Sequence, residues 1–305
     1  MRGLADAALL AVVAVACVAT VPVLVRAGWP RRSPAAAIAL WQALGLAGGT
    51  AAVGTLLCVA VPRGFFAARA LPFARPFAGR QGTTILIMVR LAFLSAGLAL
   101  FALLCWVLVA AGIAVLYARR RQRELLALLA HGDPKVPGAL VLDHPAAAAY
   151  CVPGLRSKIV VSAGALALLG DAELAAVLAH ERAHLRERHD LVLLPFTALR
   201  RAFPRSGICA EAYREVALLV EMLADDGALR ARPARELVSA LVRVGTAGQV
   251  LVGTLAAAAS DSEVTARVNR LLGPRHPLPR PVVAGICVFS ALLATAPLAL
   301  MFVFS

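Results

Sequence analysis

The chain is organised around one stretch, Leu178-Ala-His-Glu-Arg-Ala-His-Leu-Arg-Glu-Arg-His-Asp190. It contains the pattern His180-Glu181-x-x-His184. On a helix, positions i and i+4 lie on one face, so the two imidazoles point the same way. They can then hold one Zn²⁺, with Glu181 beside the open position of the metal, where its carboxylate can take a proton from water. Two histidines and a glutamate also meet by chance on solvated helices, so this interpretation needs a second element elsewhere in the chain.

The composition is that of a membrane protein. Of the 305 residues 61% are hydrophobic, and the mean hydropathy is +0.81, whereas soluble domains are near half apolar. Several long stretches contain no charged residue, and each has the roughly 20 residues that a bilayer-spanning helix needs. We therefore expect an α-helical membrane protein with four transmembrane helices, near 5–26, 36–61, 91–117 and 281–304.

These spans divide the chain into three parts. Residues 1–118 hold the first three spans, 119–279 form a long polar segment with the histidine pattern, and 280–305 hold the fourth span. In the polar segment, β-branched or apolar runs predict short strands at 139–143, 147–152 and 157–162.

Helices are predicted to follow the strands, which gives an inserted α+β domain. Their expected ranges are 164–169, 171–187, 191–203 with an interruption at Pro195, 210–230, 234–250 and 262–272. The apolar run 244–260 is broken by glycines, so we interpret it as a core helix and not as a fifth span.

The net charge of +14 comes almost entirely from arginine, since Lys135 and Lys158 are the only lysines. Arginine clusters flank the apolar spans, which favours anchoring at anionic lipid headgroups. No nucleic-acid recognition motif accompanies the charge, so direct binding of nucleic acid is not expected. The densest cluster, Arg119-Arg120-Arg121-Gln122-Arg123, predicts by the positive-inside rule that 119–279 lie in the cytoplasm and both termini outside. The arginines of 62–83 would then lie outside, against the rule.

A catalytic zinc needs a third protein ligand besides the two histidines. Asp190 follows His184 at a distance of six residues and is one option, but Glu187 stands where that type of site has a glycine. The better option is the segment Glu221-Met-Leu-Ala-Asp225, in an apolar helix where a carboxylate needs a reason to be buried.

Metal ligation would explain a buried Glu221. Asp225, one turn later, would accept the second ring N–H of a ligand histidine and so fix its tautomer. The alternative is that both carboxylates are exposed and paired with Arg214 or Arg230.

Two patterns carry a family resemblance, Ala179-His-Glu-Arg-Ala-His184 and Glu221-x-x-Ala-Asp225. Together they resemble the integral-membrane gluzincins, most closely the antibiotic-sensor-transducer metallopeptidases of the BlaR/MecR type. The resemblance covers 140–275 and includes Ser157-Lys-Ile-Val-Val-Ser-Ala-Gly-Ala-Leu166, Arg188-His189-Asp190 and Ala266-Arg-Val-Asn-Arg-Leu-Leu272. The HtpX and CAAX-prenyl proteases share the zinc pattern, with their spans arranged differently around the catalytic helix.

The resemblance implies that His180, His184 and Glu221 bind Zn²⁺, that Glu181 is the general base, and that Asp225 supports a ligand. Well-known members of the family continue after the fourth span into a penicillin-binding sensor with a Ser-x-x-Lys nucleophile. Here the chain stops at Ser305, and neither lysine has a serine three positions before it. Direct acylation by a β-lactam is therefore not expected.

The sequence thus predicts a zinc metalloendopeptidase of a bacterial cytoplasmic membrane, with the lipid bilayer and a protein or peptide substrate as partners. By resemblance the substrate is a cytoplasmic transcriptional repressor. An extended substrate is expected to pair with an edge strand near 157–162, and the candidate oxyanion partners are Tyr213, Arg214 and His189. The alternatives are a processing or quality-control peptidase of the HtpX/CAAX type and a non-catalytic membrane signalling scaffold. No residue pattern indicates an oligomeric state.

Overall fold

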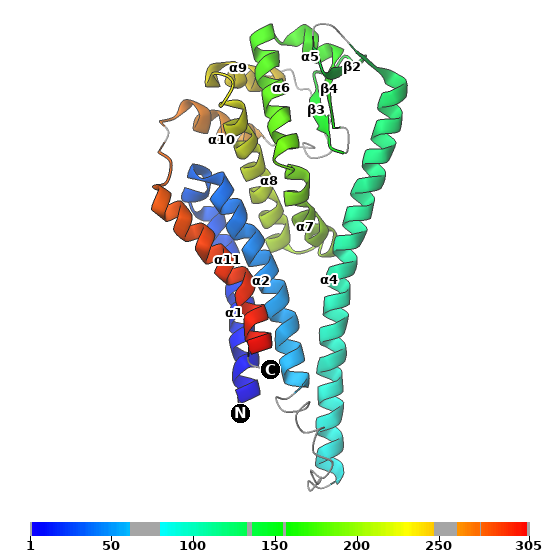
Figure 1. The fold of residues 1–305 in the computed structure, drawn as a ribbon, viewed down its shortest axis with the longest axis vertical. Helices are drawn as coiled ribbons and strands as arrows, with labels where there is room; N and C mark the ends of the chain where they lie inside the picture. Colours follow the sequence, from blue (N-terminus) through cyan, green and yellow to red (C-terminus); the bar gives the residue numbers. More distant parts are fainter. Residues whose placement is uncertain are drawn as a thin grey trace. The chain divides into compact units, whose positions relative to one another are not determined.

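A computed structural model of the chain describes residues 2–61, 80–132, 136–154, 157–246, 261–274 and 276–303. In these ranges the chain is mostly helical, with one four-stranded sheet (Figure 1). It forms two compact units. The first comprises 1–27, 39–109 and 279–305, and the second comprises 28–38 and 110–278. Several apolar helices and a small sheet with its own helices fit the predicted helical protein with an inserted α+β domain.

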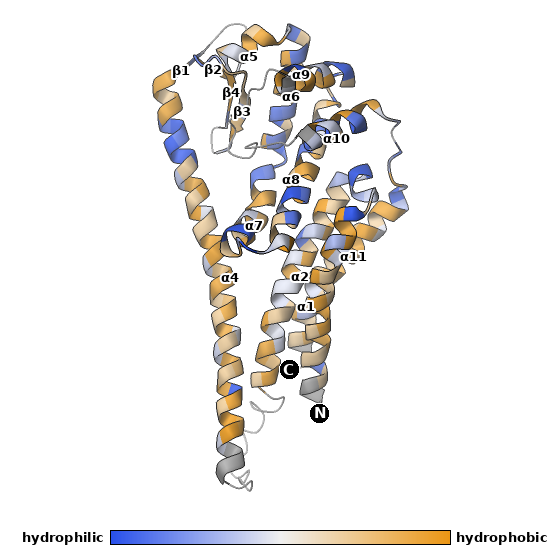
Figure 2. Cartoon of the chain, turned by 180° about the vertical axis from the view of Figure 1, so that it is seen from behind, coloured by the Kyte–Doolittle hydropathy of each residue, from blue (hydrophilic) through white to orange (hydrophobic). Residues whose placement is uncertain are grey.

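Among the described residues, four helices are long and apolar enough to cross a membrane. They are α1 (Arg2–Arg26), α2 (Pro34–Ala60), α4 (Arg80–Leu129) and α11 (Arg280–Val303). The apolar parts have mean hydropathies between 1.8 and 2.8, and Figure 2 shows the hydrophobic colour running along these helices. The predicted spans coincide with these four helices except at residue 61, which follows α2, and residue 304, which lies outside the described residues.

Helix α4 is much longer than the span predicted at 91–117, because it runs for 50 residues. The basic cluster that follows the apolar stretch lies inside this helix and does not end it. Arginine and glutamine are good helix formers, and Arg120 Nε donates to Glu124 Oε1 at 3.0 Å, one turn later. The charges therefore end the apolar surface and leave the helix intact.

In the first unit, α2 makes a close contact at Gly54. A Cβ on this residue would lie 2.9 Å from Met301 Sδ of α11 and 3.1 Å from a methyl group of Leu10 in α1. The missing side chain lets α2 approach both neighbours, as small residues do at the interfaces of membrane helices.

The sheet of the second unit has the strand order β1-β2-β4-β3. Its strands are β1 (Ala130–Gly132), β2 (Ala139–Leu142), β3 (Ala149–Val152) and β4 (Lys158–Ser162). Strands β2 and β4 are parallel, and the other two pairs are antiparallel. The expectation of an edge strand near 157–162 is wrong, because β4 pairs on both sides. The edge strands are β1, which the sequence did not predict, and β3.

Six helices follow the sheet in the described part of the second unit. They are α5 (Ala163–Leu168), α6 (Asp171–Arg186), α7 (His189–Ala202), α8 (Gly207–Ala228), α9 (Ala234–Thr246) and α10 (Asp261–Leu272). A short 3₁₀-helix, η1 (Trp29–Arg32), also belongs to this unit. Helix α7 continues through Pro195 without the predicted interruption. Most of the predicted core helix at 244–260 lies outside the described residues.

Helix α6 is the central element of this unit. Its Leu174 and Leu178 pack in one core cluster with Ile159 and Val161 of β4. Its Ala176 packs in another with Ala228 of α8. The sheet and α8 therefore hold α6 from two sides.

Helices α6 and α8 also touch closely near their ends. A Cβ on Gly227 of α8 would lie 2.5 Å from Cβ of Ala183, the residue before His184. This glycine lets the backbones of the two helices come together next to the candidate ligands.

Candidate metal centre

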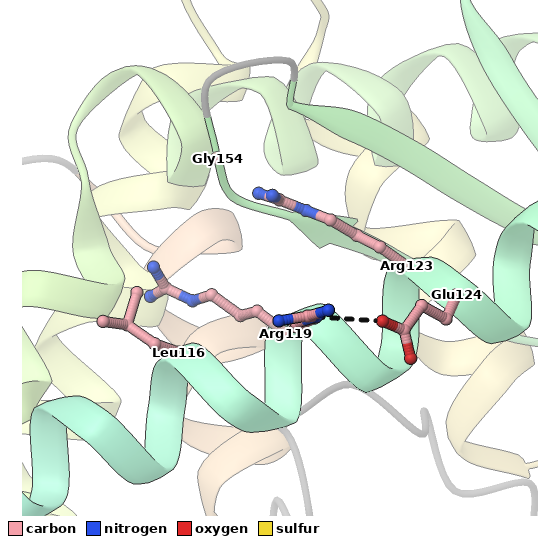
Figure 3. A pocket seen from close by; sticks show the side chains of 6 residues that line it. Leu116, Arg119, Arg123, Glu124 and Gly154 are labelled. Atoms are coloured by element: carbon pink, nitrogen blue, oxygen red, sulfur yellow. Dashed lines mark hydrogen bonds and ion pairs between the residues drawn. The ribbon is translucent and has the colours of Figure 1, made fainter.

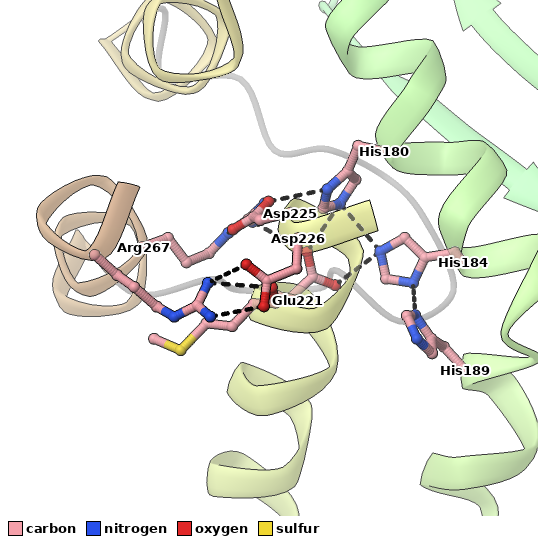
Figure 4. Close-up of polar contacts among 9 residues, drawn as sticks. His180, His184, His189, Glu221, Asp225, Asp226 and Arg267 are labelled. Atoms are coloured by element: carbon pink, nitrogen blue, oxygen red, sulfur yellow. Dashed lines mark hydrogen bonds and ion pairs between the residues drawn. The ribbon is translucent and has the colours of Figure 1, made fainter. Parts of the chain in front are cut away.

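His180 and His184 of α6 and Glu221 of α8 direct their side chains toward one point (Figure 4). The two Nε2 atoms are 3.0 Å apart. Nε2 of His180 is 3.3 Å from Glu221 Oε2, and Nε2 of His184 is 3.5 Å from Glu221 Oε1. Ligands of a tetrahedral zinc, with bonds of about 2.0–2.1 Å, lie about 3.3–3.4 Å apart. The three side chains therefore fit a single zinc ion.

The two histidines are buried, with 7% of their surface exposed, whereas the Glu221 side chain keeps 26%. A centre with three protein ligands and partial access is the arrangement of a catalytic zinc site, which keeps an open position. A structural site would close that position with a fourth protein ligand.

Asp225 orients His180. Its Oδ1 is 3.0 Å from His180 Nδ1, and the aspartate is only 1% exposed. The carboxylate accepts the Nδ1 proton, so the cation would bind at Nε2 once that nitrogen has lost its own proton. Asp225 is therefore buried beside His180 and is not on the surface with Arg214 or Arg230.

Arg267 of α10 joins the two carboxylates. Its Nη2 donates to Asp225 Oδ1 at 2.6 Å, its Nε donates to Asp225 Oδ2 at 2.9 Å, and its Nη1 lies 3.0 Å from Glu221 Oε2. Burial opposes ionisation of Asp225, but the charge of Arg267 and the contact with His180 lower its pKa to about 2. The pKa of Glu221 is also held well below its ordinary value: burial opposes this, and the charges of His184 and Arg267 outweigh it.

His180 shows that a proton and a cation compete for this centre. Burial lowers its pKa, but the hydrogen bonds to Asp225 and Glu221 outweigh burial and raise the pKa to about 9. A metal ion must displace that proton from Nε2 in order to bind.

His189 contacts Nδ1 of His184, as Asp225 contacts Nδ1 of His180. The two Nδ1 atoms are 2.9 Å apart, and His189 is fully buried, with its Nε2 3.4 Å from Glu187 Oε2. Burial and the charge of His184 lower the pKa of His189 to about 4, so the ring is neutral. If its single proton is on Nε2 and faces Glu187, its Nδ1 accepts from His184 and leaves His184 Nε2 for the cation.

The turn between α6 and α7 brings His189 back to His184. Arg188 adopts the left-handed conformation with φ 52°, the only positive φ outside glycine in the described chain. A left-handed residue reverses the chain directly after a helix. The sequence places an arginine there, where a glycine would be less strained.

Glu181 is partly buried and lies close enough to His180, His184 and Glu221 to interact with their charges. Burial raises the pKa of its carboxyl, and the two histidines oppose the rise. The Cys151 thiol of β3 forms a hydrogen bond with the Glu181 carboxylate, and burial followed by the charge of Glu181 raises the thiol pKa. Cys151 therefore stays protonated and acts as a donor to Glu181.

Other residues considered from the sequence have different partners. Asp190 forms an ion pair with Arg119 of α4 and is not part of the three-residue cluster. The Tyr213 ring faces the Arg200 guanidinium at 4.1 Å, and Arg214 Nε donates to Ala210 O at 3.4 Å. Of the three oxyanion candidates, only His189 has a recorded contact with the centre, and its Nδ1 faces His184.

Three contributors have no assigned role at the sequence level: Arg267, Cys151 and Glu187. Arg267 does lie in the stretch Ala266–Leu272, which carries part of the family resemblance. Cys151 and Glu187 have no local signal, because their roles depend on how β3 and the turn after α6 meet the centre.

Comparison with known proteins bears on the same region. Residues 116–266 match the model of Peptidase family M48. The matched range contains His180, His184 and Glu221, and peptidases of this family are generally zinc-dependent. The searches of curated proteins and of solved structures gave no match. The family match supports a metallopeptidase of the membrane type, while the closer BlaR/MecR resemblance stays a prediction.

Proposed function

We propose that this chain is a zinc-dependent endopeptidase embedded in a membrane. The observation that carries the proposal is the meeting of His180 Nε2, His184 Nε2 and the Glu221 carboxylate at zinc-ligand spacing. Glu181 is a non-ligand carboxylate next to that point, as a metallopeptidase needs. The match to Peptidase family M48 supports the same class.

Each residue of the centre has a distinct part in peptide hydrolysis. Zinc at the three ligands would supply a Lewis acid for the scissile carbonyl and lower the pKa of water. Glu181 takes the proton of the attacking water and passes it to the leaving nitrogen. Burial raises the pKa of the Glu181 carboxyl, and this direction favours holding the proton between the two transfers. The Cys151 thiol can donate a hydrogen bond to the same carboxylate.

The substrate is proposed to bind along β3, and not along the strand expected from the sequence. Ser162 N donates to Ala148 O at 2.8 Å, so the backbone of Ala148 points toward β4. In an antiparallel pair this direction alternates, so Ala149 and Cys151 turn their backbone N–H and C=O groups to the open edge. A peptide added there would run beside Glu181, which Cys151 contacts.

The η1 loop supports the predicted topology. Arg270 Nε of α10 donates to Arg31 O at 2.7 Å, and Arg32 Nε donates to His276 O at 2.8 Å. This loop joins α1 to α2, so it lies on the same side of a membrane as the unit that holds the metal centre. Together with the cluster at Arg119–Arg123, this favours a cytoplasmic peptidase unit with both termini outside, in a bacterial cytoplasmic membrane.

The signalling role rests on the family resemblance alone. In this role the substrate is a cytoplasmic transcriptional repressor, and its cleavage switches on genes. Processing or quality control of membrane proteins is the other peptidase role, and cleavage of unfolded membrane proteins in place of the repressor would favour it.

A ligand experiment tests the metal assignment. Purified Glu221→Ala should lose most of its zinc, because two imidazoles alone make a weak site, whereas Asp190→Ala should keep it. Zinc content per chain is the measurement, with the unfolding temperature as a control for folding. If Asp190→Ala loses zinc and Glu221→Ala keeps it, the assignment of the third ligand is wrong and the proposed function loses its main support.

A further inference from the structure

A cavity of about 390 Å³ lies against α4, and no residue of the metal centre lines it (Figure 3). It is an open pocket, because four of its lining residues, Leu116, Arg120, Arg123 and Glu124, are exposed. One helix face and one turn form its wall: Leu116, Arg119, Arg120, Arg123 and Glu124 of α4, and Gly154 between β3 and β4. A cavity with three guanidinium groups suits an anionic ligand.

The arginines differ in how far their charge is already compensated. Arg119 pairs with Asp190, and the exposed Arg120 pairs with Glu124. Arg123 donates to the carbonyl oxygen of Pro153, which is a neutral acceptor. Among the described contacts Arg123 therefore has no carboxylate partner, and it brings one uncompensated positive charge to the cavity wall.

Gly154 makes room for Arg123. A Cβ on this residue would overlap the Arg123 guanidinium. The glycine thus lets the guanidinium lie against the turn between β3 and β4. Figure 3 shows the Arg123 side chain extending from α4 toward Gly154.

The cavity lies where the apolar part of α4 ends. The 28 residues 91–118 carry no charge, and Leu116 in the last turn of that stretch lines the cavity. Arginine follows directly on the same helix. In a membrane protein such a junction lies at the level of the lipid headgroups, where anionic phosphates meet arginine side chains.

We propose that this cavity binds the phosphate group of an anionic membrane phospholipid. Arg123 and Arg120 would donate to the phosphate oxygens, for which the planar guanidinium is well suited. The acyl chains would follow the apolar surface of α4 beyond Leu116. The same phosphate chemistry exists in free inorganic phosphate, and the experiment separates the two sources.

The test uses the full-length chain purified in detergent, with bound lipid counted by native mass spectrometry. Phosphatidylglycerol is the anionic probe and phosphatidylcholine the zwitterionic control. The wild type should retain one phosphatidylglycerol at concentrations where phosphatidylcholine is lost. Arg123→Gln should weaken this binding about tenfold or more, as expected for a charge-assisted hydrogen bond.

Arg121→Gln is the matched control, because Arg121 is exposed on the same helix, like Arg123, but does not line the cavity. It removes the same charge and should change binding less than about twofold. Gly154→Ala keeps every charge and should also weaken binding, because its methyl group displaces the Arg123 guanidinium. Unfolding temperatures identify any variant that fails to fold. If Arg123→Gln is such a variant, Arg120→Gln takes its place in the test.

Three results would overturn the proposal. Equal losses from Arg121→Gln and Arg123→Gln would mean that diffuse charge attracts the lipid, and unchanged binding in Gly154→Ala would mean that the cavity is not used. Binding of millimolar inorganic phosphate that depends on Arg123, without retention of phosphatidylglycerol, would assign the site to a soluble anion.

Discussion

Arg267 of α10 binds both carboxylate oxygens of Asp225 of α8, with Nη2–Oδ1 at 2.6 Å and Nε–Oδ2 at 2.9 Å. Asp225 in turn contacts His180, and Arg267 also reaches Glu221. One guanidinium therefore touches a proposed metal ligand and the residue that orients another. The charge of Arg267 keeps both carboxylates ionised in a buried site.

Arg267→Lys should weaken zinc binding by about 10–100-fold, because lysine keeps the charge but cannot form the two-pronged contact with Asp225. Arg270→Lys is the matched control: Arg270 binds Asp226 in the same two-pronged way, at 2.7 and 2.9 Å, without contacting the ligands. Competition with a fluorescent zinc chelator measures the zinc affinity of both variants. Equal losses would mean that the two arginines act only by docking α10.

The ionisation of Asp225 predicts a pH dependence of stability. The folded pKa of about 2 lies below the ordinary 3.8, so the stabilisation is fully present above about pH 4 and is lost as the pH falls through 2. It amounts to about 2 kcal/mol. The unfolding temperature of the wild type should approach that of Asp225→Asn between pH 4 and pH 2. A difference that stays constant over that range would contradict the buried charge pair.

His189 should matter through its Nδ1 acceptor and not through its bulk. His189→Phe fills the space but leaves His184 Nδ1 without an acceptor, and it should lower zinc affinity by about 10–100-fold. His189→Asn offers an amide oxygen near the position of Nδ1 and should restore much of that loss. Competition with the zinc chelator measures the affinity of both variants. Equal zinc affinities of His189→Phe and His189→Asn would mean that the Nδ1 acceptor of His189 does not support the metal centre.

The left-handed Arg188 predicts a stabilising substitution. Arg188→Gly should relieve backbone strain and raise the free energy of unfolding by up to about 1 kcal/mol. Arg182→Gly, on the exposed side of α6, should lower it by about 1 kcal/mol, as glycine does inside helices. Chemical unfolding in detergent compares the two, and a loss of stability in Arg188→Gly would show that the turn is not strained.

Much of this arrangement is predictable because it depends on local spacing. His180 and His184 share a helix face through their i, i+4 separation alone, and the apolar surroundings of Glu221 indicate a buried carboxylate. Strand order is different. Whether β4 lies inside the sheet depends on its parallel pairing with β2, which leaves no local signal, and β1 is an Ala-His-Gly segment of low strand propensity that extends by pairing with β2. The partners of Arg267 likewise depend on how α10 packs on α8.

Glu181 separates catalysis from metal binding. Glu181→Gln keeps the shape of the side chain but removes the carboxylate that accepts the proton of water. Its zinc content and unfolding temperature should stay near wild type, and cleavage of a candidate repressor should fall by about 10²–10⁴-fold. His180→Ala serves as the reference, because it should lose both zinc and cleavage.

The most direct measurement is therefore the zinc content and substrate cleavage of wild type, Glu181→Gln and His180→Ala, prepared side by side. We predict a zinc-loaded but inactive Glu181→Gln protein. Wild-type cleavage or signalling output from Glu181→Gln would contradict a catalytic role for this centre.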